Sequence, residues 1–438
     1  MTLVGEDLLL WTKTLAGIII ASILLSAVGC ANPLHKIEQE LVNGNQNAGS
    51  ESLHPGLGDI NLGTLPPAAL TPSWQRNFAD YFAASLSPDG NLVAAFTLIG
   101  NASGTTQGFN VFDQQGNLLW NHTFKDEAYK SGWAKIMGPN NQIIAGAFHY
   151  NNMGSIYCFD ASGNQLWNKP VWGPTTVVHS RDGTRFGLVD STRGVVQLVN
   201  KDGTSVGAYT IRGQAKAEFF SRGNALLLQD ADRIRIIGPD GERIWETEGL
   251  SADLCQEVEL AHGGDLVAIS TDDADGSLYL FDISGNKLWE YLLFFGGSQQ
   301  LTFSPDDARL AAYDVGERAG IYVFDCQTGK LLWRHFFSAE ENIDVDIRSA
   351  QFSVDGEILW ALTVESGVAE DGKERYHLLV FAGDNGQLLQ AYTLGENVEV
   401  HVAGSGTAMI VGSHDIGKKL SHISNRLAYY ELDFANLN

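Results

Sequence analysis

The sequence is poor in cysteine and in basic residues, and both shortages exclude classes of function. Its 438 residues include 4 cysteines, and 28 lysines and arginines stand against 52 aspartates and glutamates, for a formal net charge of −24. Nucleic-acid binding depends on basic patches that release counterions, so we expect no DNA or RNA partner. Beyond Cys30, the three remaining cysteines are far apart and odd in number, which supports neither a disulfide framework nor a zinc site.

Signatures of catalysis are also missing. The chain has no HExxH, no phosphate-binding glycine loop and no paired catalytic Cys and His signature. We therefore predict no catalytic residues, no cofactor and no metal site, and we expect that the protein is not an enzyme. His179 and His401 fall on predicted innermost strands of nonadjacent repeats, so we interpret them as ordinary channel or core histidines.

The apolar stretch near the start is too short to cross a bilayer. It covers residues 15–28, whereas a membrane-spanning helix needs roughly 20 apolar residues. A lone cation, Lys13, precedes it and small residues follow it, as in an export signal. The tetrapeptide Ala27-Val28-Gly29-Cys30 resembles the lipobox of bacterial lipoproteins, although Ala27 stands where that family usually has Leu. An uncleaved membrane anchor is the alternative interpretation.

The lipobox resemblance implies a location and a division of the chain. It implies a lipoprotein-type signal peptide over residues 1–29, lipidation of Cys30, and an extracytoplasmic protein held at a membrane by its lipid. In a cell with two membranes, this places the protein in the periplasm or at the outer membrane. Residues 30–66 are small and polar, without apolar periodicity, and predict a flexible tether before a folded body over 67–438.

The sequence is rich in turns, which recur in a fixed pattern. A first turn of the SPDG type lies between two short apolar strands, where Gly supplies positive φ and Asp or Ser bonds the local backbone. Eight copies occur, at residues 87–90, 138–140, 180–183, 221–224, 262–265, 304–307, 353–356 and 404–406.

A second turn is more diagnostic, because a tryptophan follows its glycine by four residues. Five copies keep this spacing: Gly116 with Trp120, Gly163 with Trp167, Gly241 with Trp245, Gly285 with Trp289, and Gly329 with Trp333. Two further copies have Gly207 and Gln390 in place of the tryptophan. The pattern resembles the tryptophan-docking repeats of quinoprotein-like (PQQ-repeat) propellers. That resemblance implies an all-β fold, an eight-bladed β-propeller of four-stranded antiparallel blades.

The last repeat lacks its outer strand, which predicts how the ring closes. Three strands are expected at 398–403, 407–412 and 426–433, after which the chain ends. Near the start, residues 74–78 (WQRNF) match the outer strands that begin at Trp120 and Trp333. We therefore expect residues 73–78 to complete the eighth blade, which removes an exposed sheet edge.

The irregular loops on one face of the ring are the candidate binding region. They join the second strand to the third and each blade to the next, and irregular loops on a rigid scaffold often carry binding residues. We predict an apolar contact from His149, Tyr150 and Met153, and an acidic one from Asp272, Asp273, Asp275, Glu340, Glu341 and Asp344. The alternative is that the acidic residues only keep the surface soluble. The three close aspartates lack the spacing of an EF-hand, so a turn is favoured there over a calcium site.

Three hypotheses for function follow. The first is a noncatalytic, monomeric envelope lipoprotein that binds a protein partner, and its layout resembles the eight-bladed lipoprotein type of outer-membrane β-barrel assembly machinery. The second is a pyrroloquinoline quinone dehydrogenase-like enzyme, although the vicinal cysteines of that family are absent. The third is a propeller that binds a carbohydrate or small ligand in its channel.

Overall fold

The computed structural model describes one part of the chain, within the unit Pro55–Asn438. It describes residues 57–432 except for 66–69, 79–81, 102–103, 125–128, 150–152, 174, 181, 213–215, 220–224, 230–233, 239–241, 247–254, 272–275, 293–297, 316–318, 339–342, 367–373, 397 and 417–422. The predicted signal peptide and Cys30 lie outside these residues. Their assignment, like the domain boundaries, stays a prediction.

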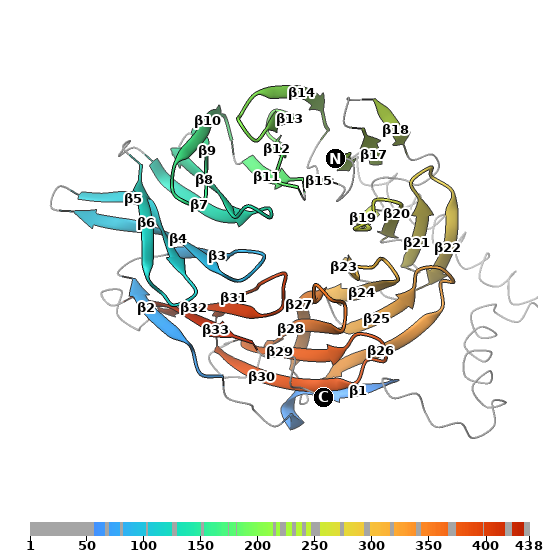
Figure 1. Ribbon diagram of the computed structural model, residues 1–438. Helices are drawn as coiled ribbons and strands as arrows, with labels where there is room; N and C mark the ends of the chain where they lie inside the picture. The colour runs from blue at the N-terminus through green and yellow to red at the C-terminus, as the bar shows by residue number, and fades with distance from the viewer. Residues whose placement is uncertain are drawn as a thin grey trace, which may run out of the picture. The chain divides into compact units, whose positions relative to one another are not determined.

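The described residues form eight sheets arranged around a ring (Figure 1), each with four antiparallel strands and one with an added parallel strand, which confirms the predicted fold class. In the first four sheets the order in space follows the order in sequence. Blade 1 contains β3 (Phe82–Leu86), β4 (Leu92–Asn101), β5 (Gly104–Asp113) and β6 (Leu118–Thr123); blade 2 contains β7 (Tyr129–Met137), β8 (Gln142–His149), β9 (Gly154–Phe159) and β10 (Gln165–Val171); blade 3 contains β11 (Thr175–His179), β12 (Arg185–Asp190), β13 (Val195–Asn200) and β14 (Ser205–Thr210); blade 4 contains β15 (Lys216–Phe219), β16 (Leu226–Gln229), β17 (Ile234–Ile237) and β18 (Arg243–Glu246).

The remaining blades include the two strands that come from the N-terminal side. Blade 5 contains β19 (Cys255–Leu260), β20 (Leu266–Thr271), β21 (Ser277–Asp282) and β22 (Lys287–Leu292); blade 6 contains β23 (Ser298–Phe303), β24 (Arg309–Val315), β25 (Gly320–Asp325), β26 (Leu331–Ser338) and the added β1 (Leu57–Asn61); blade 7 contains β27 (Asp344–Phe352), β28 (Ile358–Ser366), β29 (Arg375–Ala382) and β30 (Leu388–Glu396); blade 8 contains β31 (Val398–Val402), β32 (Ala408–Ile416), β33 (Ile423–Glu431) and β2 (Trp74–Phe78).

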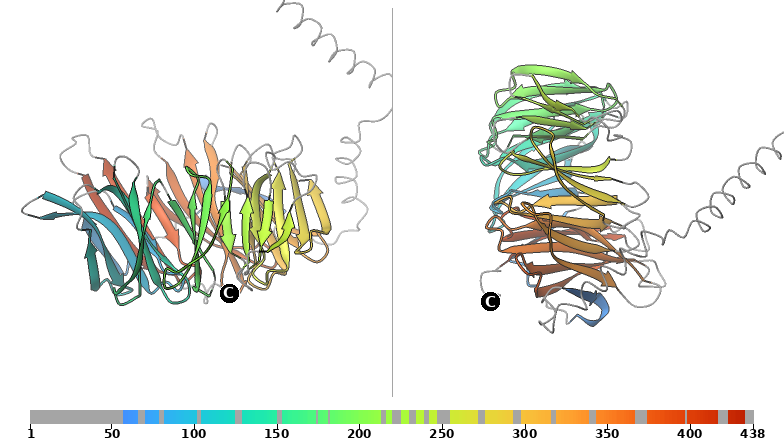
Figure 2. Two further views of the ribbon diagram at one scale, coloured as in Figure 1. Left: turned by 90° about the horizontal axis from the view of Figure 1, so that it is seen from above. Right: turned by 90° about the vertical axis from the view of Figure 1, so that its right-hand side faces the viewer.

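The strands run between two faces of the ring (Figure 2). Because the neighbouring strands within each blade are antiparallel, the first and second turns lie on one face of the ring, here called the turn face. The connections from second to third strand and from blade to blade lie on the other, here called the loop face. The hydrophobic core is divided in the same way, since each of eight apolar clusters fills the seam between two adjacent blades.

The predicted closure of the ring is confirmed. β2 pairs with β33 along its whole length, with Trp74 opposite Tyr429 and Phe78 opposite Asn425. The two aromatic rings stack with their centroids 5.6 Å apart. The N-H of Ser73 donates to the carbonyl of Tyr429 at 2.8 Å, so backbone bonds join the two ends of the ring.

Each docking tryptophan lies against the second turn of the next blade. Its indole N-H donates to a backbone carbonyl of that turn in five pairs: Trp74 to Gln114 (3.0 Å), Trp120 to Ala161 (2.9 Å), Trp167 to Lys201 (3.0 Å), Trp289 to Cys326 (2.8 Å) and Trp333 to Gly383 (3.2 Å). The glycine of the turn touches the same ring, because an added Cβ would stand 2.6–2.8 Å from the indole at Gly116, Gly163, Gly203, Gly329 and Gly386. The glycine is therefore required both by its positive φ and by the neighbour's tryptophan.

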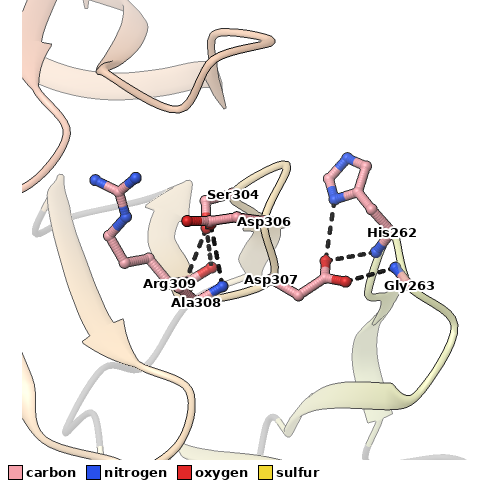
Figure 3. A network of polar contacts seen from close by, with 7 residues as sticks. All are labelled: His262, Gly263, Ser304, Asp306, Asp307, Ala308 and Arg309. Carbon is pink, nitrogen blue, oxygen red and sulfur yellow. Dashed lines mark hydrogen bonds and ion pairs between the residues drawn. The ribbon is translucent and has the colours of Figure 1, made fainter.

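Two first turns use a side chain where five others among the described residues use glycine. Asn141 and Asp307 have left-handed backbones, with φ of 50° and 59°. Each reaches back to the preceding blade: Asn141 Nδ2 donates to Asp89 at 3.1 Å, and Asp307 accepts from the backbone N-H groups of His262 (2.6 Å) and Gly263 (Figure 3). These bonds offset the cost of the left-handed conformation.

The fifth strand of blade 6 differs from the expectation for residues 30–66. Within that range, β1 pairs in parallel with β26 from Leu57 opposite Arg334 to Asn61 opposite Ser338. A 3-10 turn, η1 (Leu62–Thr64), follows, and Leu62 is 3% exposed in the seam between blades 6 and 7. The short polar sequence LGDIN carries no strand signal of its own, and pairing with a sheet edge supplies the missing stabilisation.

Among the described residues, no helix has the length and hydropathy needed to cross a membrane. Cys158 and Cys326 are free and buried. Burial, together with the charge of Asp160, raises the pKa of Cys158 to about 12, so this thiol is unreactive at neutral pH.

Replacement of a turn glycine tests the docking contact. Gly163→Ala places a methyl group against Trp120 at φ +90°, so we expect the free energy of unfolding to fall by about 2–4 kcal/mol in urea titrations. Gly207→Ala is the matched control, because the nearest atom to its added Cβ is the Tyr209 hydroxyl at 3.8 Å, and we expect a change within about 0.5 kcal/mol. Equal effects of the two changes would contradict the docking account.

Candidate functional site

Three of the predicted site residues, His149, Met153 and Asp344, lie among the described residues. All three are on the loop face, since His149 ends β8, Met153 precedes β9 and Asp344 begins β27. The others lie outside the described residues: Tyr150, Asp272, Asp273, Asp275, Glu340 and Glu341. Their contribution to binding stays a prediction.

The connection from β8 to β9 holds an exposed methionine. The N-H of His149 donates to the carbonyl of Met153 at 2.8 Å, which closes the end of this hairpin. Met153 is 38% exposed. A large flexible apolar side chain is thus held at the rim of blade 2 by backbone bonding.

Trp172 continues this apolar surface on the neighbouring strand. Val171 of β10 pairs with Gly154 of β9, so Trp172 and Met153 are the next residues outward on the two strands. Trp172 is 49% exposed. Met153, Trp172 and Arg193 are together called the Trp172 surface below.

Arg193 comes to this surface from blade 3. Its guanidinium carbon lies 4.7 Å from the centre of the Trp172 ring, within the range of a cation–π contact. The backbone N-H of Arg193 donates to the Asp190 carboxylate at 3.0 Å, which fixes the β12–β13 connection. The surface therefore spans the boundary between two blades.

The Trp172 surface was only partly foreseen from the sequence, although a signal for it exists. Trp172 follows the docking Trp167 by five residues and matches no position of the repeat. A tryptophan that architecture does not require is a candidate for binding. Arg193 carried no such signal, because its place over Trp172 depends on contact between blades.

The surroundings of Asp344 are more balanced in charge than the sequence suggested. Asp344 is exposed and opposite Ser366. Nearby, Arg348 pairs with Glu374 at 3.2 Å, and the Tyr376 hydroxyl donates to Glu374 at 2.6 Å. Burial and the Glu374 carboxylate raise the pKa of Tyr376 to about 12. Paired charges of this kind agree better with a solvated surface than with a ligand site.

A charged cluster that sequence reasoning did not single out lies on the innermost strands of blades 4 to 6. Lys216 Nζ of β15 pairs with Glu257 of β19 and donates to the carbonyl of Val258 at 2.9 Å. Gln300 of β23 donates to the other oxygen of Glu257 at 3.2 Å. On β15, Lys216 and Glu218 alternate with the apolar residues Ala217 and Phe219. This alternation is the sequence signal that could have indicated the cluster.

Two carboxyl groups of this cluster hold protons more tightly than usual. Burial is the main cause of a rise in the pKa of Glu218 to about 7, which Lys216 opposes and Glu257 reinforces. Burial and the charge of Glu218 also raise the pKa of Glu259 well above its ordinary value. The Glu218 Oε2 atom has no hydrogen-bond partner among the described residues. Both groups are therefore easier to bury protonated than ionised.

The two predicted channel histidines have ordinary partners. The Nδ1 atom of His179 lies 3.0 Å from the Ser180 carbonyl, and burial lowers the pKa of His179. His401 Nε2 lies 3.0 Å from Glu399. Across the described ranges, no three His, Cys, Asp or Glu side chains come together as a metal site would require.

One hydroxyl–imidazole–carboxylate chain in blade 7 superficially resembles a catalytic arrangement. His377 Nε2 lies 3.0 Å from Glu365, its Nδ1 lies 3.3 Å from the Thr393 hydroxyl, and Arg375 approaches Glu365 at 3.4 Å. Glu365 is 2% exposed and His377 is 5% exposed. The chain thus provides partners for a buried carboxylate, which is sufficient to explain it.

The raised carboxyl pKa values predict how stability depends on pH. The folded state retains protons on this cluster that the unfolded chain releases, so the contribution of Glu218 to stability is full below about pH 4.5 and is lost as pH rises through about 7. We expect Glu218→Gln to flatten this fall and to be more stable than the wild type at pH 8 by about 1–3 kcal/mol in urea titrations.

Glu357→Gln is the matched control, since Glu357 is exposed on the first turn of blade 7. We expect it to retain the wild-type pH profile. An unchanged slope in Glu218→Gln would contradict the assignment of the proton to this cluster.

Comparison with known proteins identifies similar sequences and folds. A PQQ-repeat family model, described as outer membrane protein assembly factor BamB, matches residues 152–301. The matched range runs from the end of the β8–β9 connection into β23. No curated protein sequence matches the chain.

Solved structures with a similar fold are WD40 and related propellers. Sqt1 from Chaetomium thermophilum is 14% identical, covers 83% of this chain and 100% of its own, and has a TM-score of 0.56. The same protein bound to the N-terminus of ribosomal protein L10 is 13% identical, with 87% and 100% covered and a TM-score of 0.53. The C-terminal WD40 domain of Sif2 is 14% identical, with 83% and 99% covered and a TM-score of 0.54. At these identities the similarity concerns the fold alone.

Proposed function

The chain is a β-propeller of the PQQ-repeat type, and from this premise we propose that it is a noncatalytic scaffold that binds a protein partner through the Trp172 surface. The observation that carries the proposal is the exposed indole of Trp172 under the guanidinium of Arg193, beside Met153. Tryptophan, arginine and methionine are enriched at protein interfaces, and tryptophan and arginine dominate binding energies.

Trp172 differs from the docking tryptophans in its exposure to solvent. Docking indoles such as Trp120 and Trp167 bury their rings against the next blade and satisfy their N-H groups there. Trp172 leaves half of its surface in water, and covering an indole removes a large apolar area from solvent. A partner that covers Trp172 would gain the free energy of burying this apolar surface. The indole would need little ordering on binding, because Arg193 of blade 3 already packs against it.

The similar proteins support a protein partner in general terms. The matching family model bears the description of an assembly factor, and one solved propeller of this fold is bound to a peptide segment of ribosomal protein L10. A carbohydrate is the second candidate, because sugars stack on open indole faces. Arg193 already covers one face of Trp172, which favours the protein partner.

The N-terminal sequence supports a location at the cell envelope. We infer that residues 1–29 direct export, that Cys30 receives a lipid, and that the propeller acts at the cell envelope as a monomer. A lipid anchor and a polar segment before the propeller would hold the scaffold near a membrane-bound partner.

Removal of the indole tests the binding role. A photoreactive amino acid at the position of Met153 should form a covalent adduct with one protein partner in intact cells, and the same probe at Leu288 should not. Adding Trp172→Ala should reduce the adduct about tenfold or more, since the loss of a central aromatic contact costs at least that much affinity.

Leu288 is a suitable control because it is also 49% exposed, on the outer strand of blade 5. Adducts of equal yield from both positions, or an adduct unaffected by Trp172→Ala, would rule out this surface. A thermal shift with glycans that disappears in Trp172→Ala would favour the carbohydrate alternative.

Replacement of the proposed lipid site tests the location. In a bacterial host with two membranes, the wild-type chain should incorporate labelled palmitate and sediment with membranes. Cys30→Ser should lose the label and move to the soluble extracytoplasmic fraction. Membrane sedimentation of Cys30→Ser without label would instead indicate an uncleaved anchor.

A further inference from the structure

Two outer strands of the propeller have nearly the same sequence but different surroundings. Residues 331–337 of blade 6 read LLWRHFF, and residues 118–124 of blade 1 read LLWNHTF. In both, a bulge precedes the tryptophan, so that Leu332 and Leu119 are the extra residues. β26 and β6 therefore have similar outer edges, with which a further strand could pair.

The edge of blade 6 is covered by the chain itself. β1 pairs in parallel with β26 beyond the bulge and continues into η1 (Figure 1). Ile60 and Leu65 pack with Leu332 against the apolar cluster that contains Leu62. An extended aliphatic segment is thus an observed occupant of this type of edge.

No described strand pairs with the outer edge of blade 1. β6 is the outermost strand of its sheet in the part of the chain that the structure describes. Leu118 is 48% exposed and Leu119 is 49% exposed. An uncovered strand edge with neighbouring aliphatic side chains is a template for pairing with another chain.

Three other outer strands carry features that oppose pairing. Pro170 in β10 lacks a backbone N-H, and ion pairs place Lys287 with Glu290 (2.7 Å) on β22 and Arg243 with Glu246 on β18. β6 contains no Asp, Glu, Lys or Arg. Among these four edges, that of blade 1 is the one without such a feature. The outer strand β14 is also uncharged, but it has Gly207 in place of the tryptophan and so lacks the sequence match to β26.

We propose that β6 is a docking site for an extended aliphatic segment of a protein partner, which adds to blade 1 as a parallel fifth strand in the way that β1 adds to blade 6. Backbone bonds to the strand after the bulge would supply affinity, and contact with Leu118 and Leu119 would supply selectivity. The site is separate from the Trp172 surface and does not depend on it.

The chain provides its own probe for this site. The synthetic peptide LGDINLGTL, residues 57–65, with a photoreactive leucine at the position of Ile60, is mixed with the full-length protein and irradiated. Ile60 lies opposite Phe337 in blade 6, which corresponds to Phe124 in blade 1. We expect adducts within residues 121–124 by mass spectrometry, and we expect Leu119→Asp to lower their yield about tenfold or more.

Leu288→Asp is the matched control, since it places the same charge at the same position of blade 5, and it should leave the yield unchanged. Adducts found on β26 alone would mean exchange with β1 and would overturn the proposal. Adducts scattered over the surface, or adducts on β6 that survive Leu119→Asp at full yield, would overturn it as well.

Discussion

The contact between a tryptophan of one blade and a turn glycine of the next is the interaction on which the rest of the ring depends. It joins sheets that share no strand, because the indole packs on the glycine and donates to a carbonyl of the same turn. Trp74 makes this contact from β2, so this one strand both completes blade 8 and docks that blade on blade 1. The ring is thereby closed by hydrogen bonds and by a tryptophan rather than by a covalent link.

This constraint explains how much of the fold was predictable. The turn requires a glycine because its φ is positive, and the tryptophan must follow this glycine by four residues. Both requirements are local, and both recur in the sequence. The closure of the ring could be predicted by counting strands. The last repeat lacked an outer strand, and the sequence near the start contained an outer strand without inner strands of its own. β1 was not predictable, because its five residues form a strand only where β26 offers an edge.

The candidate site was less predictable for the same reason. The position of Met153 on an irregular loop is predictable from the repeat, and its side chain is exposed. Trp172 was visible as an indole outside the repeat, but its pairing with Arg193 depends on how blades 2 and 3 meet. The proton-holding Glu218 likewise depends on neighbours from another blade, which no local pattern encodes. Residues that obey the repeat build the ring, and residues that depart from it are the candidates for function.

We infer that docking tryptophans, present at six of the eight seams between blades, make the blades one cooperative ring closed at Trp74. Hydrogen exchange under native conditions, compared between the wild type and Trp74→Ala, tests this claim directly. Backbone protection in Trp74→Ala should then fall in all blades by a common factor, roughly 30- to 100-fold. The reason is that opening the ring loosens the packing between every pair of neighbouring blades. Faster exchange confined to blades 8 and 1, with unchanged protection in blades 3 to 6, would contradict it.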